Sequence, residues 1–236
     1  MKEVQKSELL IFFDFEATQF SRQAIAVGLV AYRKDPESLL PKEEVLRYFS
    51  YIKADDEIGP IVEELTGIHQ ENLDYQGITF HEMVLEISKL LRPYKFRKFI
   101  SYGGLDIEIL RQSMNEDNET EINFFRNIIK NYFDLHSYLE RRVVTEKGQS
   151  YSLVSMADLL SVTEEGTPHD PLFDSLLLKD IYAAYVSDEE RALALTMKNY
   201  EKNHFASSYN SELAHLVLSE GKATKEDLLR IVRAHL

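Results

Sequence analysis

The chain has 236 residues, of which 27 are basic and 40 acidic, so its formal charge is −13 and its sequence pI is about 5.0. This acidity argues against a protein that holds duplex DNA through its overall field, but not against a nucleic-acid enzyme whose carboxylates bind metal. The absence of cysteine excludes disulfides, zinc–thiolate sites and thiol nucleophiles, and it leads us to expect a cytoplasmic location.

The apolar runs of the chain are too short to cross a membrane. The longest, residues 24–32, has about half the length that a membrane span needs. Residues 2–8 mix acidic and basic side chains, which is not the pattern of a signal peptide. We therefore expect no membrane association. The length of the chain predicts one sizeable domain, or one domain with an appendage.

The first third of the chain predicts three strands. A continuous apolar run over Leu9–Phe13 is typical of a central strand that is covered on both faces. Ala24–Tyr32 and Val45–Ile52 are rich in β-branched and aromatic residues and predict the next two strands. Because the connections between them are short, we expect an antiparallel meander.

Helical periodicity begins at residue 58 and then alternates with strands. Strands are predicted over Lys98–Tyr102 and, as a short strand or a helix start, over Tyr132–Leu135. This order predicts a mixed sheet with helices on both faces, in the α/β class. The predicted helices are Ile58–Leu65, Phe80–Leu91, Ile107–Met114, Ile122–Lys130, Tyr151–Leu160 and Leu172–Val186.

The last 50 residues form a separate part of the pattern. From Ser187 onward the sequence is wholly helical, and Thr224 with Asp227 forms a capping box for a last helix over Lys225–Ala234. We therefore divide the chain into residues 1–186 and a C-terminal helical extension, residues 187–236. No linker rich in Pro, Gly or Ser separates the two parts, which favours an extension packed on the first part over a tethered one.

Two carboxylates follow the first strand directly, in Asp14-Phe15-Glu16. Side chains alternate along a strand, so Asp14 and Glu16 project from one face. Carboxylates held this close repel each other unless a proton or a divalent cation lies between them, and Mg²⁺ prefers such an all-oxygen site. Taken alone, this motif is explained more simply by a strand that becomes polar where it ends.

A second acidic motif follows the strand predicted at Lys98–Tyr102. Gly103 and Gly104 allow a sharp turn, and Asp106 then opens the next helix. Such a residue can be a metal ligand, or it can stabilise the helix dipole alone.

The third candidate pair is His169 and Asp174. Asp170 and Pro171 predict an N-cap and a first helical residue, which places Asp174 in the first turns of that helix. Prolines disfavour helical angles in the residue before them, so we expect His169 in an extended, mobile approach segment that can converge with Asp174. An exposed loop histidine is the alternative.

Asp14, Glu16, Asp106, His169 and Asp174, in this order, resemble the DEDDh 3′–5′ exonucleases of the ribonuclease H-like superfamily. The resemblance covers about residues 8–186, and residues 65–68 (Leu-Thr-Gly-Ile) are similar to the L-T-G-I segment of the family. Phe-Glu-Ala-Thr after Asp14 and Gly-x-x-Asp at the second motif look like the histone-mRNA and short-RNA exonucleases, more than the replicase proofreading subunits. The resemblance implies a three-layer α/β/α fold with a mixed five-stranded sheet.

The resemblance also implies the chemistry. Two Mg²⁺ ions, which Mn²⁺ can replace, would be held by Asp14, Glu16, Asp106 and Asp174 and would clamp the attacking and leaving oxygens at phosphorus. Asp14 would bridge the ions, Glu16 and Asp174 would complete the attacking side, and Asp106 would hold the ion of the leaving group. His169 would be the general base. The products would be nucleoside 5′-monophosphates released from the 3′ end of single-stranded RNA or short oligonucleotides.

The expected substrate contacts lie in two segments. Ala17 and Thr18 follow the metal strand, and Thr66 and Ile68 belong to the L-T-G-I segment, although a plain helix stop at Gly67 explains the latter two equally well. A cluster of five cations in ten residues either follows a phosphate backbone or forms a solvated helix end. These cations are Lys89, Arg92, Lys95, Arg97 and Lys98.

Two other functions compete with an exonuclease that prefers RNA over DNA. One is a DNA 3′–5′ exonuclease of the proofreading or repair type. The other is a catalytically silent ribonuclease H-like module that binds partners through its helical extension. The intact set of five residues argues against the silent module, since such a module would be free to lose any of them.

Overall fold

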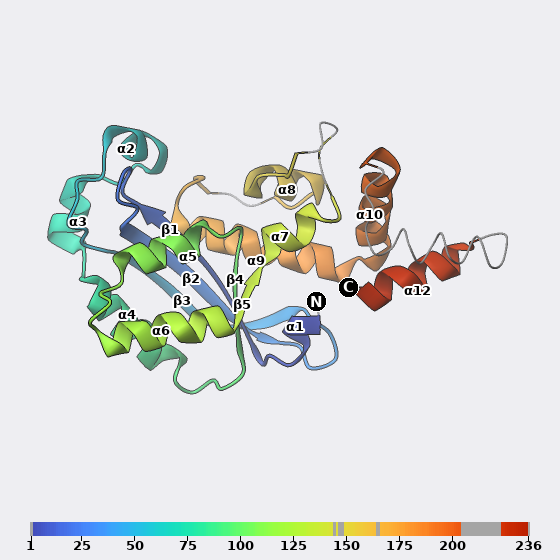
Figure 1. Cartoon of the computed structure of the whole chain (residues 1–236), viewed down its shortest axis with the longest axis horizontal. Helices are drawn as coiled ribbons and strands as arrows, with labels where there is room; N and C mark the ends of the chain where they lie inside the picture. Colours follow the sequence, from blue (N-terminus) through green and yellow to red (C-terminus); the bar gives the residue numbers. More distant parts are fainter. Residues whose placement is uncertain (1, 144, 146–148, 164–165, 204–222, 236) are drawn as a thin grey trace.

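The computed structural model describes residues 2–143, 145, 149–163, 166–203 and 223–235 (Figure 1). Its centre is one five-stranded sheet in the order β3-β2-β1-β4-β5. The strand β1 pairs with β2 antiparallel and with β4 parallel, so the sheet is mixed as predicted. The strands are β1 (Leu9–Ala17), β2 (Ala24–Lys34), β3 (Pro41–Tyr51), β4 (Arg97–Ser101) and β5 (Tyr132–Asp134).

The strand β1 runs further than its apolar sequence predicts. It ends at Ala17 and not at Phe13, because β2 pairs with it over the whole stretch, including Asp14 opposite Gly28 and Glu16 opposite Ala26. The two carboxylates therefore lie within the regular strand, and their side chains follow its alternation.

One face of the sheet is covered by three helices, drawn in green tones in Figure 1. Odd-numbered residues of β1, such as Ile11, Phe13 and Phe15, belong to the core on this side. Phe15, at 6% exposure, is buried in this core although it lies between the two carboxylates. The helices are α4 (Phe80–Leu91), α5 (Leu105–Ser113) and α6 (Glu119–Lys130).

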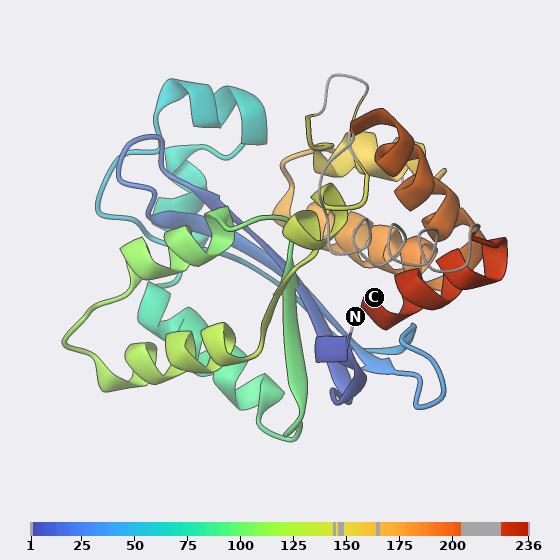
Figure 2. The same ribbon diagram turned by 45° about the vertical axis from the view of Figure 1, so that its right-hand side comes forward.

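Three further helices cover the opposite face, where Leu10 and Phe12 of β1 are buried. The long helix among them lies on the other side of the strands from the green helices (Figure 2). Its Tyr182 ring meets Phe12 of β1 edge-on at 5.4 Å between centroids. The three helices are α7 (Leu135–Glu140), α8 (Leu153–Leu159) and α9 (Pro171–Ser187). The fold is thus a three-layer α/β/α sandwich, as expected.

Three short helices complete the first part of the chain, namely α1 (Lys2–Gln5), α2 (Pro60–Thr66) and α3 (Gln70–Gln76). The sequence did not predict α1 or α3, and it predicted α7 only as a helix that could start within Tyr132–Leu135. In α3 only Leu73 is buried, so its sequence carries no apolar periodicity, and α7 has six residues, too few for a period to show.

The C-terminal part contains α10 (Glu189–Asn203) and α12 (Lys225–His235). Ala192 of α10 is buried in the core cluster of α8 and α9, and Arg191 donates to the Leu159 carbonyl at 2.6 Å. The predicted capping box of α12 is present, with the Thr224 N–H donating to Asp227 Oδ2 at 3.0 Å and the Asp227 N–H to Thr224 Oγ1 at 3.2 Å. The helical prediction for residues 204–222 lies outside the described residues.

Among the described helices, none combines the length and the apolar composition that crossing a membrane requires.

Candidate active site

Asp14 and Glu16 lie on the face of β1 that α9 covers. Beyond Phe12 the strand has no partner on its β4 side, because the pairing of β1 with β4 ends at Phe12 and Ile100. The end of β1 that carries the carboxylates is therefore open at that edge, and other groups can reach its backbone.

Asp106 reaches this open edge from the first turn of α5. It is 5% exposed, and its Oδ1 accepts a hydrogen bond from the Phe15 N–H at 2.9 Å. Phe15 lies between Asp14 and Glu16, so this bond places the third carboxylate beside the first two.

The turn that presents Asp106 is held by a partly buried polar network. Gly103 has a φ of +107°, which favours glycine. Its carbonyl accepts hydrogen bonds from the Ser101 hydroxyl at 2.7 Å and from the Tyr132 hydroxyl at 2.5 Å. Its N–H donates to Asp134 Oδ1 at 3.0 Å. Ser101, Tyr132 and Asp134 were not identified as site residues from the sequence; the polar residues at the ends of the neighbouring strands β4 and β5 are the signal that could have found them.

Asp174 comes from the first turns of α9 and is 8% exposed. The predicted cap of this helix is present, since Asp170 Oδ1 accepts from the N–H groups of Leu172 at 2.9 Å and Phe173 at 3.1 Å. Oδ2 of Asp174 accepts the His169 N–H at 3.1 Å. Its Oδ1 is buried and has no hydrogen-bond partner.

His169 was predicted in an extended segment, and this prediction is wrong. Its φ is +66°, and the Asp170 N–H donates to the Thr167 carbonyl at 3.1 Å. Residues 167–170 therefore form a tight turn, with Pro168 as its second residue and His169 as its third. Turns of this type favour proline in the second position and require a positive φ in the third. The rule that a proline makes the preceding residue extended does not act on His169 itself, because the residues that precede the prolines are Thr167 and Asp170.

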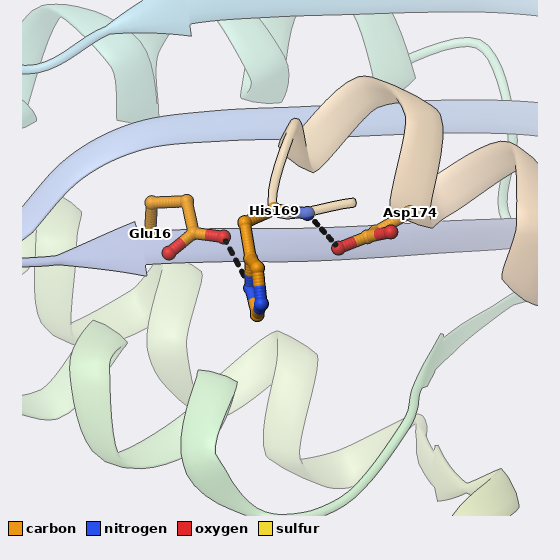
Figure 3. A group of neighbouring side chains, drawn as sticks. All are labelled: Glu16, His169 and Asp174. Atoms are coloured by element: carbon orange, nitrogen blue, oxygen red, sulfur yellow. Dashed lines mark hydrogen bonds and ion pairs between the residues drawn. The ribbon is translucent and has the colours of Figure 1, made fainter. Parts of the chain in front are cut away.

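The turn directs the imidazole toward β1 (Figure 3). Nδ1 of His169 lies 3.7 Å from Oε1 of Glu16, and the histidine side chain is 52% exposed. Glu16, His169 and Asp174 each offer a ligand atom, and these atoms lie within 4.8 Å of one another. Residues 153 positions apart in the sequence thus share one small site.

Burial raises the pKa values of all four carboxyl groups, and the charges of neighbouring carboxylates raise them further. Burial raises the pKa of Glu16 to about 8, with further contributions from the charges of Asp174 and Asp106. Burial also raises the pKa of Asp106 to about 7, although the hydrogen bond that Asp106 accepts from the Phe15 N–H opposes this shift. The pKa of Asp14 is raised well above its ordinary value by burial and then by Asp106, Glu16 and Asp174.

The pKa of Asp174 is raised by burial too, although the His169 N–H opposes this shift. Within the described part of the chain, no lysine or arginine forms an ion pair with these four carboxyl groups. A hard divalent cation prefers oxygen ligands and would offset the repulsion between these carboxylates. It would also give a partner to Oδ1 of Asp174, which has none. The residues present therefore fit a divalent metal site.

The predicted substrate residues have structural roles in this conformation. Thr18 is 2% exposed, and its hydroxyl contacts Ser21 Oγ at 2.7 Å and accepts the Gln23 N–H at 3.1 Å, which closes the turn between β1 and β2. Ala17 is the last residue of β1 and is half-buried. Their contact with a nucleotide stays a prediction.

The L-T-G-I segment ends α2. Gly67 has a φ of +68°, and Thr66 Oγ1 donates to the Val62 carbonyl at 2.8 Å and accepts the Ile68 N–H at 3.0 Å. Ile68 is buried in a small cluster with Ile25 and Leu73. The helix stop is thus present, and the contacts of Thr66 and Ile68 with a terminal base stay predictions.

The cluster of five cations lies at the wrong end of the sheet for a phosphate path to the carboxylates. Arg97 is in register with Leu9, at the start of β1, whereas Asp14 and Glu16 lie toward its end. Arg97 also donates to the Leu91 carbonyl at 3.0 Å, and Lys98 is buried. Because β1 and β4 run parallel, the cations at the start of β4 lie beside the start of β1, away from the carboxylates toward its end.

Comparison with solved structures gives the same fold. The nuclease domain of 3′hExo, a DEDDh family member, bound to rAMP, matches with a TM-score of 0.60 and 18% identity over 77% of this chain and 93% of that one. Cell-death related nuclease 4 (CRN-4) matches with 0.63 and 20% over 77% and 64%. E. coli exonuclease I in complex with a dA16 oligonucleotide matches with 0.55 and 14% over 79% and 42%.

At the level of sequence, no family model matches the chain and no curated protein matches it. The structural matches agree with the strand order and the helical layers described above. The chain thus has the ribonuclease H-like fold of the DEDDh 3′-exonucleases.

Proposed function

We propose that this chain is a cytoplasmic, metal-dependent 3′–5′ exonuclease that releases nucleoside 5′-monophosphates from single-stranded nucleic acid. The observation that carries the proposal is the convergence of Asp14, Glu16, Asp106, His169 and Asp174 at one end of the sheet. A divalent cation would offset the repulsion that these neighbouring carboxylates impose on Asp14 and Glu16. The fold shared with nucleases gives the site a chemical context.

The carboxyl groups would hold two Mg²⁺ ions, with Mn²⁺ as a substitute. Asp14 would contact both ions, Glu16 and Asp174 would complete the attacking side, and Asp106 would complete the leaving-group side. When bound, the ions would stabilise the charge that develops on the attacking and leaving oxygens at phosphorus. The unpartnered Oδ1 of Asp174 supports its part in this assignment.

His169 would act as the general base. Its Nδ1 is turned toward Oε1 of Glu16, which leaves Nε2 as the nitrogen that takes the proton from the attacking water. The half-exposed imidazole can meet solvent and substrate, while its backbone N–H is tied to Asp174. The turn would therefore hold the base and a metal ligand in a common frame.

The substrate in this proposal is the 3′ end of a single strand, with RNA preferred over DNA. The Phe15-Glu16-Ala17-Thr18 segment favours RNA through its likeness to the short-RNA exonucleases. The five-cation cluster gives no support, since it lies at the far end of the sheet. Among the structural neighbours, one is bound to rAMP and one to a dA16 oligonucleotide.

A matched degradation assay tests the proposal. Single-stranded RNA and DNA 24-mers of the same sequence, labelled at the 5′ end, are incubated with the protein and Mg²⁺, then with excess chelator, then with Mn²⁺. The expected result is a ladder that shortens from the 3′ end, faster with RNA, lost with chelator and restored by Mn²⁺. Internal cleavage, shortening from the 5′ end or full activity in excess chelator would contradict it.

A further inference from the structure

Gly28 lies in the middle of β2, directly opposite Asp14 of β1. A Cβ atom at this position would lie less than 3.0 Å from the backbone of Pro171 and Leu172, the first two residues of α9. Its neighbours on the same face, Ala26 and Val30, carry side chains and are buried. Glycine within a strand often marks the close approach of another backbone, and here that backbone is the start of α9.

The buried hydroxyl of Ser175, on α9, also contacts the backbone of β2 at Gly28. Ser175 is fully buried, and its Oγ lies 2.9 Å from the Gly28 carbonyl oxygen and 2.8 Å from the Pro171 carbonyl oxygen. The hydroxyl proton is shared between the sheet and the first turn of the helix. The close packing at Gly28 and this hydrogen bond thus act on one point of α9.

The first turns of α9 also carry Asp174, and the tight turn directly before this helix carries His169. Asp174 precedes Ser175, and the His169 N–H is bound to Asp174 Oδ2 at 3.1 Å. The Asp174 N–H donates to the Asp170 carbonyl at 2.8 Å. A displacement of this turn away from β2 would therefore move His169 and Asp174 together, away from Asp14 and Glu16.

We propose that Gly28 and Ser175 are positioning residues that set how closely the end of α9 with His169 and Asp174 approaches Asp14. The effect on metal binding and turnover rests on the proposed function, whereas the effect on the position of α9 does not. Neither residue touches the reacting groups. Each acts through the packing of the start of α9 against β2. The missing side chain of Gly28 determines the distance, and the hydroxyl of Ser175 maintains it.

The test compares Gly28→Ala with Leu29→Ala. Leu29 is the next residue of β2 and belongs to the core on the opposite face of the sheet, so its truncation weakens the protein without touching α9. The affinity for Mn²⁺ alone is measured by electron paramagnetic resonance, with the unfolding midpoint of each variant. We expect Gly28→Ala to bind Mn²⁺ at least tenfold more weakly than Leu29→Ala, even where Leu29→Ala is less stable. An affinity loss no greater than that of Leu29→Ala would overturn the proposal.

Ser175→Ala provides a milder variant that keeps Gly28. It removes the shared hydrogen bond and adds no bulk, so we expect a smaller loss of Mn²⁺ affinity in a folded protein. If Gly28→Ala does not fold, an unchanged affinity in Ser175→Ala overturns the proposal.

Hydrogen exchange separates this inference from the proposed function. In metal-free protein, the amides of residues 172–176 are expected to exchange faster in Gly28→Ala than in Leu29→Ala. A wild-type protein that binds no Mn²⁺ and degrades neither RNA nor DNA would refute the proposed function. The exchange of residues 172–176 would still decide the positioning role of Gly28.

Discussion

Oδ1 of Asp106 accepts a hydrogen bond from the N–H of Phe15 at 2.9 Å, across 91 residues of sequence. This bond takes the place of a strand partner, because β4 pairs with β1 only as far as Phe12. Asp106 therefore has two properties that can be separated. It completes the hydrogen bonding of β1, and it adds a negative charge beside Asp14.

Two substitutions at Asp106 separate these properties. Asp106→Asn keeps an oxygen acceptor for the Phe15 N–H, whereas Asp106→Ala leaves this buried donor unpaired, at about 1–3 kcal/mol. Both should lose activity and Mn²⁺ affinity, but only Asp106→Ala should be less stable than wild type in metal-free urea unfolding at pH 8. Equal stability of the two variants would show that the hydrogen bond contributes nothing.

The metal-free protein should lose stability as the pH rises. The folded state raises the pKa of Glu16 to about 8 and of Asp106 to about 7, so it keeps protons that the unfolded chain has released at about pH 4–5. Stability is then full below the unfolded pKa values and falls up to about pH 8, by about 1.4 kcal/mol per pH unit for each proton retained only by the folded state.

Urea unfolding in chelator between pH 4 and 9 measures this dependence. Asp14→Asn should flatten it, because it removes one of the mutually repelling groups. Added Mn²⁺ should reverse it above pH 7, since the ionised carboxylates bind the cation. A metal-free midpoint that rises steadily from pH 5 to pH 8.5 would contradict the raised pKa values.

His169 should be required for turnover and not for metal binding. His169→Ala should lower the single-turnover rate by about 10²–10⁴-fold, the usual effect of losing a general base, with Mn²⁺ affinity within a few-fold of wild type. A parallel loss of Mn²⁺ affinity would instead make His169 a ligand, together with Glu16 and Asp174.

The backbone at position 169 gives an independent check. Because His169 has a φ of +66°, His169→Gly should be more stable than His169→Ala by about 1 kcal/mol. Both variants lack the imidazole, so their activities should be equally low. Equal unfolding midpoints would mean that the left-handed turn is absent in solution.

Neighbouring substitutions on the two faces of β1 should differ sharply. Asp14→Ala should abolish turnover and lower metal affinity, since Asp14 is assigned to both ions. Phe15→Leu changes a core residue that meets Phe13 edge-on at 6.0 Å between centroids, and should lower stability by less than about 1.5 kcal/mol with activity kept. A wild-type rate in Asp14→Ala would place the site elsewhere.

Deletion of residues 187–236 should affect stability more than the metal site. It removes the buried side chains of Ala192 and Leu193 and the hydrogen bond from Arg191 to the Leu159 carbonyl. The unfolding midpoint should fall, with Mn²⁺ affinity retained in the folded fraction. A truncated protein with wild-type stability that loses RNA affinity alone would make this part a substrate-binding element.

The sequence by itself determined those features that depend on neighbouring residues. The alternation of Asp14 and Glu16 along a strand, the cap of α9 at Asp170 and the capping box at Thr224 all appear as predicted. Each depends on backbone geometry within a few residues, which amino-acid identity specifies directly. The antiparallel pairing of β1 with β2 and of β2 with β3 also followed, because short connections favour antiparallel neighbours.

Only the tertiary structure decided which distant groups meet. It placed Asp106 against the Phe15 N–H, seated the first turn of α9 on Gly28, and held His169 in a left-handed turn beside Glu16. It also moved the five-cation cluster away from the carboxylates, through the parallel register of Arg97 with Leu9. Contacts of this kind depend on how strands pair and how closely helices approach the sheet, and no local pattern of residues encodes these distances.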